Sequence, residues 1–286
     1  MIGTCMDQSK KFPLWVSHSK LALFLRCSRA YYLQYEYKDP KTGHKINIIN
    51  PALSLGNAVH EVFEMLLEEK IPAEKRMEKS LLTFFNTAWM KFSGKAGGFK
   101  NTQEEQEYKN RGELMIQRVM DNPGPLIKKT LKLPEASDGL PPRFLLSEKE
   151  NILLCGKVDW LEYLPDEDAV HIIDFKTGKH DEDPNSLQLP IYSLLVKNLQ
   201  KRPVKKISYW YLETDNNPKE MVKPDDDTAV KAIVDVAVQI KKARQLGEFR
   251  CLRIGGCFAC RPLENIINGN AEFIRTSGYQ DIYAEI

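Results

Sequence analysis

Two apolar stretches joined by a turn decide the fold class of this chain. The first reads Ile152-Leu-Leu-Cys-Gly-Lys-Val-Asp-Trp-Leu-Glu-Tyr-Leu164, and the second ends in His171-Ile-Ile-Asp-Phe-Lys-Thr-Gly178. Short apolar runs bounded by turn-forming residues are typical of β-strands. The turn at Pro165–Asp168 therefore predicts that strands at 152–164 and 170–176 pair antiparallel as a hairpin.

This hairpin would bring two carboxylates and an ammonium onto one face. In its simplest register Asp159 lies directly opposite Asp174, with the Cβ atoms about 5 Å apart. Side chains alternate along a strand, so Lys176 shares the face of Asp174 and Phe175 faces the other way. A slip of one residue would separate the carboxylates. Both aspartates interrupt apolar runs, where a buried charge needs a partner.

Opposed carboxylates repel each other unless a cation lies between them. Hard oxygen ligands suit Mg²⁺ or Mn²⁺, so the pattern predicts a divalent metal site with Lys176 beside it. A surface hairpin with a weak Lys–Asp ion pair is the alternative that the pattern alone leaves open.

Helical patterns precede the hairpin, and mixed elements follow it. Apolar spacing predicts helices at 19–37, 55–69, 72–94, 103–121, 186–198 and 225–246. Further strands are predicted at 144–149 and 206–213, whereas 39–51 and the chain after 246 are interpreted as loop. This order of elements predicts one α/β domain over residues 1–286.

Composition limits the classes of function. The net charge of +2 argues against a protein that coats nucleic acid non-specifically, although a local basic groove is compatible with it. No apolar stretch is long enough to span a bilayer, and no secretory signal is recognised, so we expect a cytoplasmic protein without membrane contact. The phosphate-binding motif GxxxxGK[ST] is absent from the sequence, so we expect no motor activity in this chain.

Five motifs together resemble the PD-(D/E)xK nuclease superfamily. Gly156-Lys-Val-Asp159 followed by Ile173-Asp-Phe-Lys-Thr-Gly178 resembles its catalytic core. Gly56-Asn-Ala-Val-His60, Gln188-Leu-Pro-Ile-Tyr192 and Cys27 resemble the GxxxH segment, the QxxxY motif and the N-terminal cysteine of RecB-like nucleases. That subgroup includes CRISPR-associated exonucleases, and the motifs follow its order from about residue 19 to 262.

The resemblance implies a three-layer αβα restriction-endonuclease-like core with a mixed central sheet and a helical insertion, or cap, at about 61–135. It implies four metal ligands, namely His60, Asp159, Asp174 and the backbone carbonyl of Phe175. It also implies that Lys176 activates the attacking water and that Gln188 and Tyr192 order the site and contact the DNA backbone. Without the resemblance, a lone helical histidine is more often a core residue, and Pro190 fits a helix only in its first turn.

RecB-like nucleases often hold a [4Fe–4S] cluster with one N-terminal and three C-terminal cysteines. In the common order the last cysteine follows a CxxC pair, but Ile266 occupies that position here and Cys251 precedes the pair. Cys5 and Cys155 are predicted to be non-ligands. The remaining four cysteines are Cys27 and, in the C-terminal segment 247–286, Cys251, Cys257 and Cys260. Three interpretations stay open for them: they hold an iron–sulfur cluster, they bind a Zn²⁺ ion, or they are the remnant of a lost site.

The resemblance predicts a metal-dependent deoxyribonuclease, an exonuclease on single-stranded DNA or DNA ends. It would work with a helicase, recombination or CRISPR-adaptation protein. A catalytically silent DNA-binding or scaffold subunit is the alternative, and nothing in the sequence separates DNA from RNA as substrate. Four aromatic residues are candidates for stacking on single-stranded bases: Tyr31, Tyr32, Tyr209 and Trp210.

Overall fold

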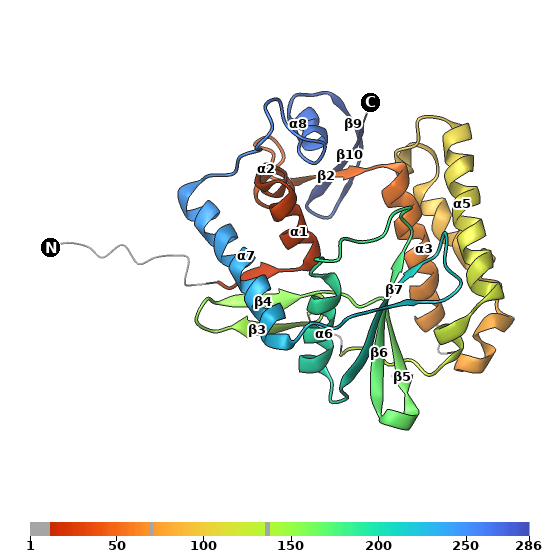
Figure 1. Cartoon of the computed structure of the whole chain (residues 1–286). Coiled ribbons are helices and arrows are strands. Elements are labelled where there is room, and N and C mark those ends of the chain that lie inside the picture. Colours follow the sequence, from red (N-terminus) through yellow and green to blue (C-terminus); the bar gives the residue numbers. More distant parts are fainter. Residues whose placement is uncertain (1–11, 69–70, 135–137, 286) are drawn as a thin grey trace.

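The computed structural model describes residues 12–68, 71–134 and 138–285 (Figure 1). Its helices are α1 (His18–Arg26), α2 (Ser28–Tyr31), α3 (Pro51–Glu68), α4 (Leu81–Trp89), α5 (Thr102–Asp121), α6 (Gln188–Leu199), α7 (Asp226–Leu246) and α8 (Arg261–Ile267). Its strands are β1 (Leu14–Val16), β2 (Lys45–Ile49), β3 (Arg143–Ser147), β4 (Ile152–Cys155), β5 (Trp160–Leu164), β6 (Ala169–Lys176), β7 (Val204–Tyr211), β8 (Lys219–Met221), β9 (Ala271–Ser277) and β10 (Gln280–Glu285). No helix in this part of the chain is long and apolar enough to cross a membrane.

The central sheet has the strand order β5-β6-β7-β8. β6 runs parallel to β7, while β5 and β8 are antiparallel to their neighbours, so the sheet is mixed. Two smaller sheets have the orders β1-β4-β3 and β2-β10-β9. The parallel pair β6 and β7 is connected through α6, as parallel strands require a crossover.

Helices cover both faces of the central sheet (Figure 1). Along β6, Val170 and Ile172 belong to a core shared with α1, α6 and α7. Ile173 and Phe175 belong to a second core shared with α3, α4 and α5. Successive side chains of one strand thus enter opposite cores, as the pleat requires. This three-layer αβα arrangement with a mixed sheet confirms the predicted fold class, and β6 lies at its centre.

The β5–β6 hairpin has the predicted register. Trp160 pairs with Ile173, and one further step along the ladder would place Asp159 opposite Asp174. The prediction of a single strand at 152–164 is wrong, because this segment forms two strands in different sheets. β4 pairs with β1 and β3, whereas β5 pairs with β6 in the central sheet. Asp159 therefore lies where β5 begins, beside the end of β6.

A small sheet joins segments from opposite ends of the chain. β10 pairs parallel with β2 and antiparallel with β9, and Lys45 lies opposite Gln280. The interpretation of 39–51 and of the chain after 246 as loop is therefore wrong, since these segments contain β2, α8, β9 and β10. A strand whose partner is this distant in sequence has no local signal beyond a few apolar residues.

The helical patterns before the hairpin form helices with different boundaries. The predicted helix at 19–37 is divided at Cys27, whose extended backbone (φ −165°) ends α1 and caps α2. The predicted helix at 72–94 is divided into a 3-10 turn at Ala73–Glu78, α4 and shorter turns. Together α3, α4 and α5 cover the Phe175 face of the sheet. The boundaries of a helical insertion at 61–135 and the single-domain organisation stay predictions.

Candidate active site

Two acidic groups and one lysine gather where β6 ends. Asp174 and Lys176 extend from β6 toward α6, opposite to Phe175, so the predicted alternation is confirmed. Lys176 Nζ lies 3.0 Å from Asp174 Oδ2 and 3.2 Å from an oxygen of Glu182. Asp174 is 1% exposed at its side chain and Lys176 is 15% exposed, so the pair lies in a nearly closed environment.

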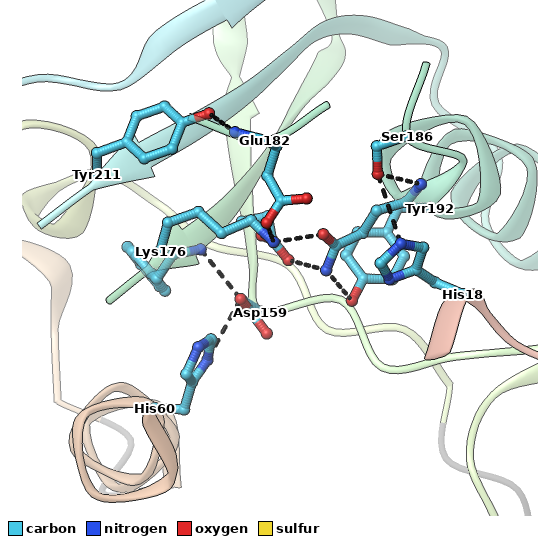
Figure 2. A network of polar contacts seen from close by, with 11 residues as sticks. His18, His60, Asp159, Lys176, Glu182, Ser186, Tyr192 and Tyr211 are labelled. Atoms are coloured by element: carbon cyan, nitrogen blue, oxygen red, sulfur yellow. Dashed lines mark hydrogen bonds and ion pairs between the residues drawn. The ribbon is translucent and has the colours of Figure 1, made fainter. Parts of the chain in front are cut away.

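Asp159 joins this group from the start of β5. Its Oδ2 accepts a hydrogen bond from the backbone N–H of Phe175 at 3.0 Å. The same oxygen lies 3.3 Å from Nδ1 of His60, which reaches it from α3 (Figure 2). A residue in a strand directs its N–H and C=O toward the same edge, so the Phe175 carbonyl also faces Asp159. The structure thus brings the four predicted ligand residues to one place.

Gly56 lets α3 approach the end of β6. A Cβ atom there would lie 3.4 Å from Thr177 Oγ1, so α3 and the loop after Lys176 are close to van der Waals contact at this glycine. His60 follows one helical turn later on the same face. The GxxxH spacing therefore has a packing reason, because the glycine sets the contact that places the histidine.

Gln188 and Tyr192 approach from α6 and bind the same groups. Gln188 Nε2 donates to Asp174 Oδ1 at 2.8 Å and to the Tyr192 hydroxyl at 3.3 Å. Its Oε1 accepts a hydrogen bond from Lys176 Nζ at 2.5 Å. Pro190 lies in the first turn of α6, which meets the condition for a proline at that position. Both side chains are under 10% exposed, so they are placed to order the site.

The charges of this site are unbalanced in a way that suits a cation. Burial, followed by the nearby charge of Asp159, raises the pKa of Asp174 to about 7. Although burial opposes it, the Asp159 charge raises the pKa of His60, and His60 in turn lowers the pKa of Asp159. Asp174 Oδ2 is buried and has no hydrogen-bond partner within the described ranges, and its ion-pair partner is Lys176 Nζ at 3.0 Å. An oxygen of this kind fits a divalent-metal ligand.

Comparison with known families agrees with this geometry. The model of the PD-(D/E)XK nuclease superfamily matches residues 15–265. The chain belongs to this superfamily. Its members are nucleases that use divalent metals, and the matched range contains the whole carboxylate and lysine cluster at the end of β6. A search of curated proteins found no match for this chain.

The PD-(D/E)XK match also contains a second cluster, made of thiols. The sulfur atoms of its four cysteines all lie within 4.8 Å of one another. Cys27 lies between α1 and α2, and the others lie in and around the loop before α8, so residues from opposite ends of the chain meet here: Cys27, Cys251, Cys257 and Cys260. Cys155 lies in β4, where it donates to the Val16 carbonyl, and Cys5 lies outside the described residues.

The thiol cluster has the chemistry of a metal site. Although burial opposes it, hydrogen bonds from the backbone N–H groups of Cys260 and Ala259 lower the pKa of Cys257 to about 6. Burial raises the pKa values of Cys27 and of Cys260, the latter to about 12. Neighbouring thiols thus resist joint ionisation, and a bound cation removes that resistance. Four converging thiolate donors fit either Zn²⁺ or an iron–sulfur cluster.

Four further residues of this PD-(D/E)XK site were not predicted from the sequence: Glu182, Tyr211, His18 and Ser186. Glu182 pairs with Lys176, and its backbone N–H donates to the Tyr211 hydroxyl at 3.0 Å (Figure 2). His18 Nε2 lies 3.4 Å from the Ser186 hydroxyl, next to the start of α6. Glu182 stands among the acids of a polar loop, and His18 lies far from the motifs in sequence, so neither carried a local signal.

The prediction of aromatic stacking positions is mostly wrong. Tyr31, Tyr209 and Trp210 are at most 2% exposed, because they fill the cores on the two faces of the sheet. Lys176 Nζ covers the ring of Tyr209 at 5.0 Å from its centroid. Tyr32 is half-buried beside Phe249. These aromatic rings support the site and the cores, and three of them are closed to bases.

His18 makes the stability of the fold sensitive to acid. Burial, with a smaller contribution from Lys176, lowers its pKa from 6.5 to about 4. The unfolded chain therefore binds this proton more tightly, and stability falls as the pH drops from about 6.5 toward 4. Between pH 7 and pH 4.5 we expect the free energy of unfolding to fall by about 2 kcal/mol less in His18→Gln than in the wild-type protein. Urea unfolding of both proteins at the two pH values tests this, and an unchanged pH dependence would contradict it.

Proposed function

We propose that this protein is a RecB-like, metal-dependent deoxyribonuclease that acts as an exonuclease on single-stranded DNA or DNA ends. The observation that carries the proposal is the buried Asp174 oxygen without a hydrogen bond, 3.0 Å from the Lys176 ammonium and beside Asp159. The single Lys176 ammonium lies beside two nearly buried carboxylates, so their burial costs free energy that a bound divalent cation would offset. Phosphodiester hydrolysis uses such a cation together with a nearby proton donor.

The residues divide into ligands and positioning groups. Mg²⁺ or Mn²⁺ would be held by His60, Asp159, Asp174 and the Phe175 carbonyl. When bound, the ion supplies positive charge that polarises the scissile phosphate and lowers the pKa of water. His60 needs its neutral form to act as a ligand, so metal binding would compete with the proton that Asp159 now favours on its ring.

Lys176 is the group that would orient the attacking water. An ammonium has three N–H donors, and here it has three partners: Asp174, Glu182 and Gln188. Since Asp174 Oδ2 accepts no hydrogen bond within the described residues, one N–H of this ammonium would be available to a water molecule. Glu182 and Gln188 keep the ammonium in place, and the nearby positive charge favours the hydroxide form of that water.

The RecB-like assignment rests on the order of five motifs, from Cys27 through His60, Asp159 and Lys176 to the Gln188–Tyr192 pair, whereas the C-terminal cysteines depart from the common order. Enzymes of that subgroup are expected on DNA ends or single strands. Because the sequence contains no phosphate-binding motor motif, unwinding would come from a partner, for which a helicase, recombination or CRISPR-adaptation protein is proposed.

Degradation assays with defined substrates test the proposed activity. We expect the wild-type protein to degrade end-labelled single-stranded DNA with Mg²⁺ or Mn²⁺ and to be inactive in EDTA. Asp174→Asn keeps the size of the side chain but loses the anionic ligand, so metal binding measured by calorimetry and cleavage should both fall below detection. Circular single-stranded DNA separates exonuclease from endonuclease action. A folded wild-type protein that binds DNA but cleaves none under these conditions would favour the silent scaffold instead.

We also propose that the four cysteines hold a metal centre that fastens the 247–286 segment to α1 and α2. The RecB-like resemblance favours a [4Fe–4S] cluster. The 3.8 Å between the Cys257 and Cys260 sulfurs instead matches a single zinc ion, since bonds of about 2.3 Å give tetrahedral edges of about 3.8 Å. Thiolates on a four-iron cube stand about 6 Å apart, so that cluster would require the site to open. Iron, sulfide and zinc analysis of purified protein decides between them, and a metal-free protein would contradict both.

A further inference from the structure

A cleft opens beside the metal-ligand residues and has no role in the mechanism above. Its volume is about 350 Å³, and Asp159 and His60 both line it. One wall is α3, the other is formed by residues 131–133 and 139–142, and Phe175 closes the bottom. Cavities of about 300–1,000 Å³ are the usual size of small-ligand sites, and this one is at the lower end.

The second wall of the cleft is fixed to the strands on either side of Asp159. The N–H of Leu131 donates to the Leu161 carbonyl at 2.8 Å, which joins this wall to β5. On the other side, the N–H of Gly156 donates to the Pro142 carbonyl at 3.2 Å, just after β4. Backbone hydrogen bonds therefore attach the described parts of this wall to the strands on both sides of Asp159.

The lining of the cleft suits an uncharged, flat group. Its walls include the apolar side chains of Leu67, Leu133, Leu140 and Pro141, which are half-buried or exposed. Its lysines, Lys132 and Lys157, are matched by acidic residues, and Lys157 Nζ is already 2.6 Å from Glu64. A phosphate would gain no net attraction from such walls, whereas a nucleobase can pack on apolar side chains once it is unstacked.

We propose that this cleft binds the base of the nucleotide next to the scissile phosphate. The inference rests on the proposed nuclease function and deepens it, because a phosphate near Asp159 would place the adjoining base at the mouth of the cleft. A base that is paired in a duplex cannot enter without unpairing and unstacking. The substrate class is therefore an unpaired strand, either single-stranded nucleic acid or a frayed end.

Binding without cleavage gives the first test. Labelled single-stranded oligonucleotides, intact or with one abasic position, are titrated with the Lys176→Ala protein in Mg²⁺ and followed by fluorescence anisotropy. We expect about tenfold weaker binding for the oligonucleotide whose abasic position occupies the cleft. Leu140→Trp in the same protein fills the cleft, and it should weaken binding of the intact strand and abolish the difference between strands.

The matched control is Leu145→Trp, because Leu140 and Leu145 are each 46% exposed but Leu145 lies on β3 and outside the cleft. It should leave binding unchanged. Equal affinity for intact and abasic strands, or equal effects of the two tryptophans, would overturn the inference.

Single-turnover cleavage of the same strands by the wild-type protein gives the second readout. We expect cleavage to slow about tenfold at the phosphate beside the abasic position. Cleavage that proceeds unchanged at every abasic position overturns the inference and leaves the nuclease function standing. Base-dependent binding without any cleavage would instead support the cleft assignment and contradict the nuclease function.

Discussion

Lys176→Ala is expected to lower single-turnover DNA cleavage by at least about 1,000-fold, a loss in the range for removing a catalytic proton-transfer or charge-stabilising group. The ammonium contacts Asp174, Glu182 and Gln188, so its removal takes away the positive charge proposed to orient the attacking water. Both proposed aspartate ligands remain, and metal binding by calorimetry should persist. The decisive combination is retained metal binding with lost cleavage.

Controls for this variant come from the chain itself. Lys197→Ala removes an exposed lysine of α6 that pairs with Asp226, and it should leave cleavage unchanged. Lys176→Arg restores the charge but replaces a compact ammonium with a planar fork, so we expect it to recover little activity. Thermal unfolding of each variant shows whether the fold is retained. Full cleavage by a folded Lys176→Ala protein would reject the assignment of this lysine.

Cys27→Ser is expected to remove the metal from the thiol centre and to destabilise the protein by at least about 3 kcal/mol, since binding free energy at a structural metal site is also folding free energy. Among the four clustered cysteines of the described residues, Cys27 comes from the N-terminal part and the other three lie beyond α7. Losing Cys27 would therefore weaken the attachment of the C-terminal segment to α1 and α2, which the β2–β10 pairing and the Arg29–Glu264 ion pair would still hold in part. Metal analysis and thermal unfolding measure the two effects.

The matched variant is Cys155→Ser, because Cys155 is equally buried but lies in β4 and outside the thiol cluster. It should keep the full metal content, whatever it does to packing in the core. Chelation of the wild-type protein should reproduce the lowered melting temperature of Cys27→Ser. A Cys27→Ser protein with unchanged metal content and melting temperature would show that the cluster has no structural role.

The centre of the site could be predicted because it is local in sequence. The register of the β5–β6 hairpin follows from a short turn and from apolar alternation, so the relation of Asp159, Asp174 and Lys176 was readable. Resemblance to known motifs was needed for His60 and Gln188. Their placement depends on how α3 and α6 pack against β6, which no single-segment pattern contains.

The features that could not be predicted depend on tertiary contacts. The break between β4 and β5 arises because β4 finds better partners in β1 and β3. Glu182 became part of the site because the loop after β6 folds back over Lys176. Similarly, the sequence left the role of Cys251 open, and only the meeting of the chain ends brought its sulfur to the other three.

The parallel pairing of β2 with β10 has a consequence for how this protein is made. Lys45 leaves the ribosome long before its partner Gln280, with a delay of roughly 10 to 50 s at translation rates of about 5–20 residues per second. Until then β2 is an unpaired edge that can associate with other chains. In the same way, the Cys27 thiol has no partner in the thiol cluster until Cys251, Cys257 and Cys260 have been synthesised. Pairing of β2, and any metal binding by the four cysteines, must therefore wait until the segment from Cys251 to Glu285 has been translated.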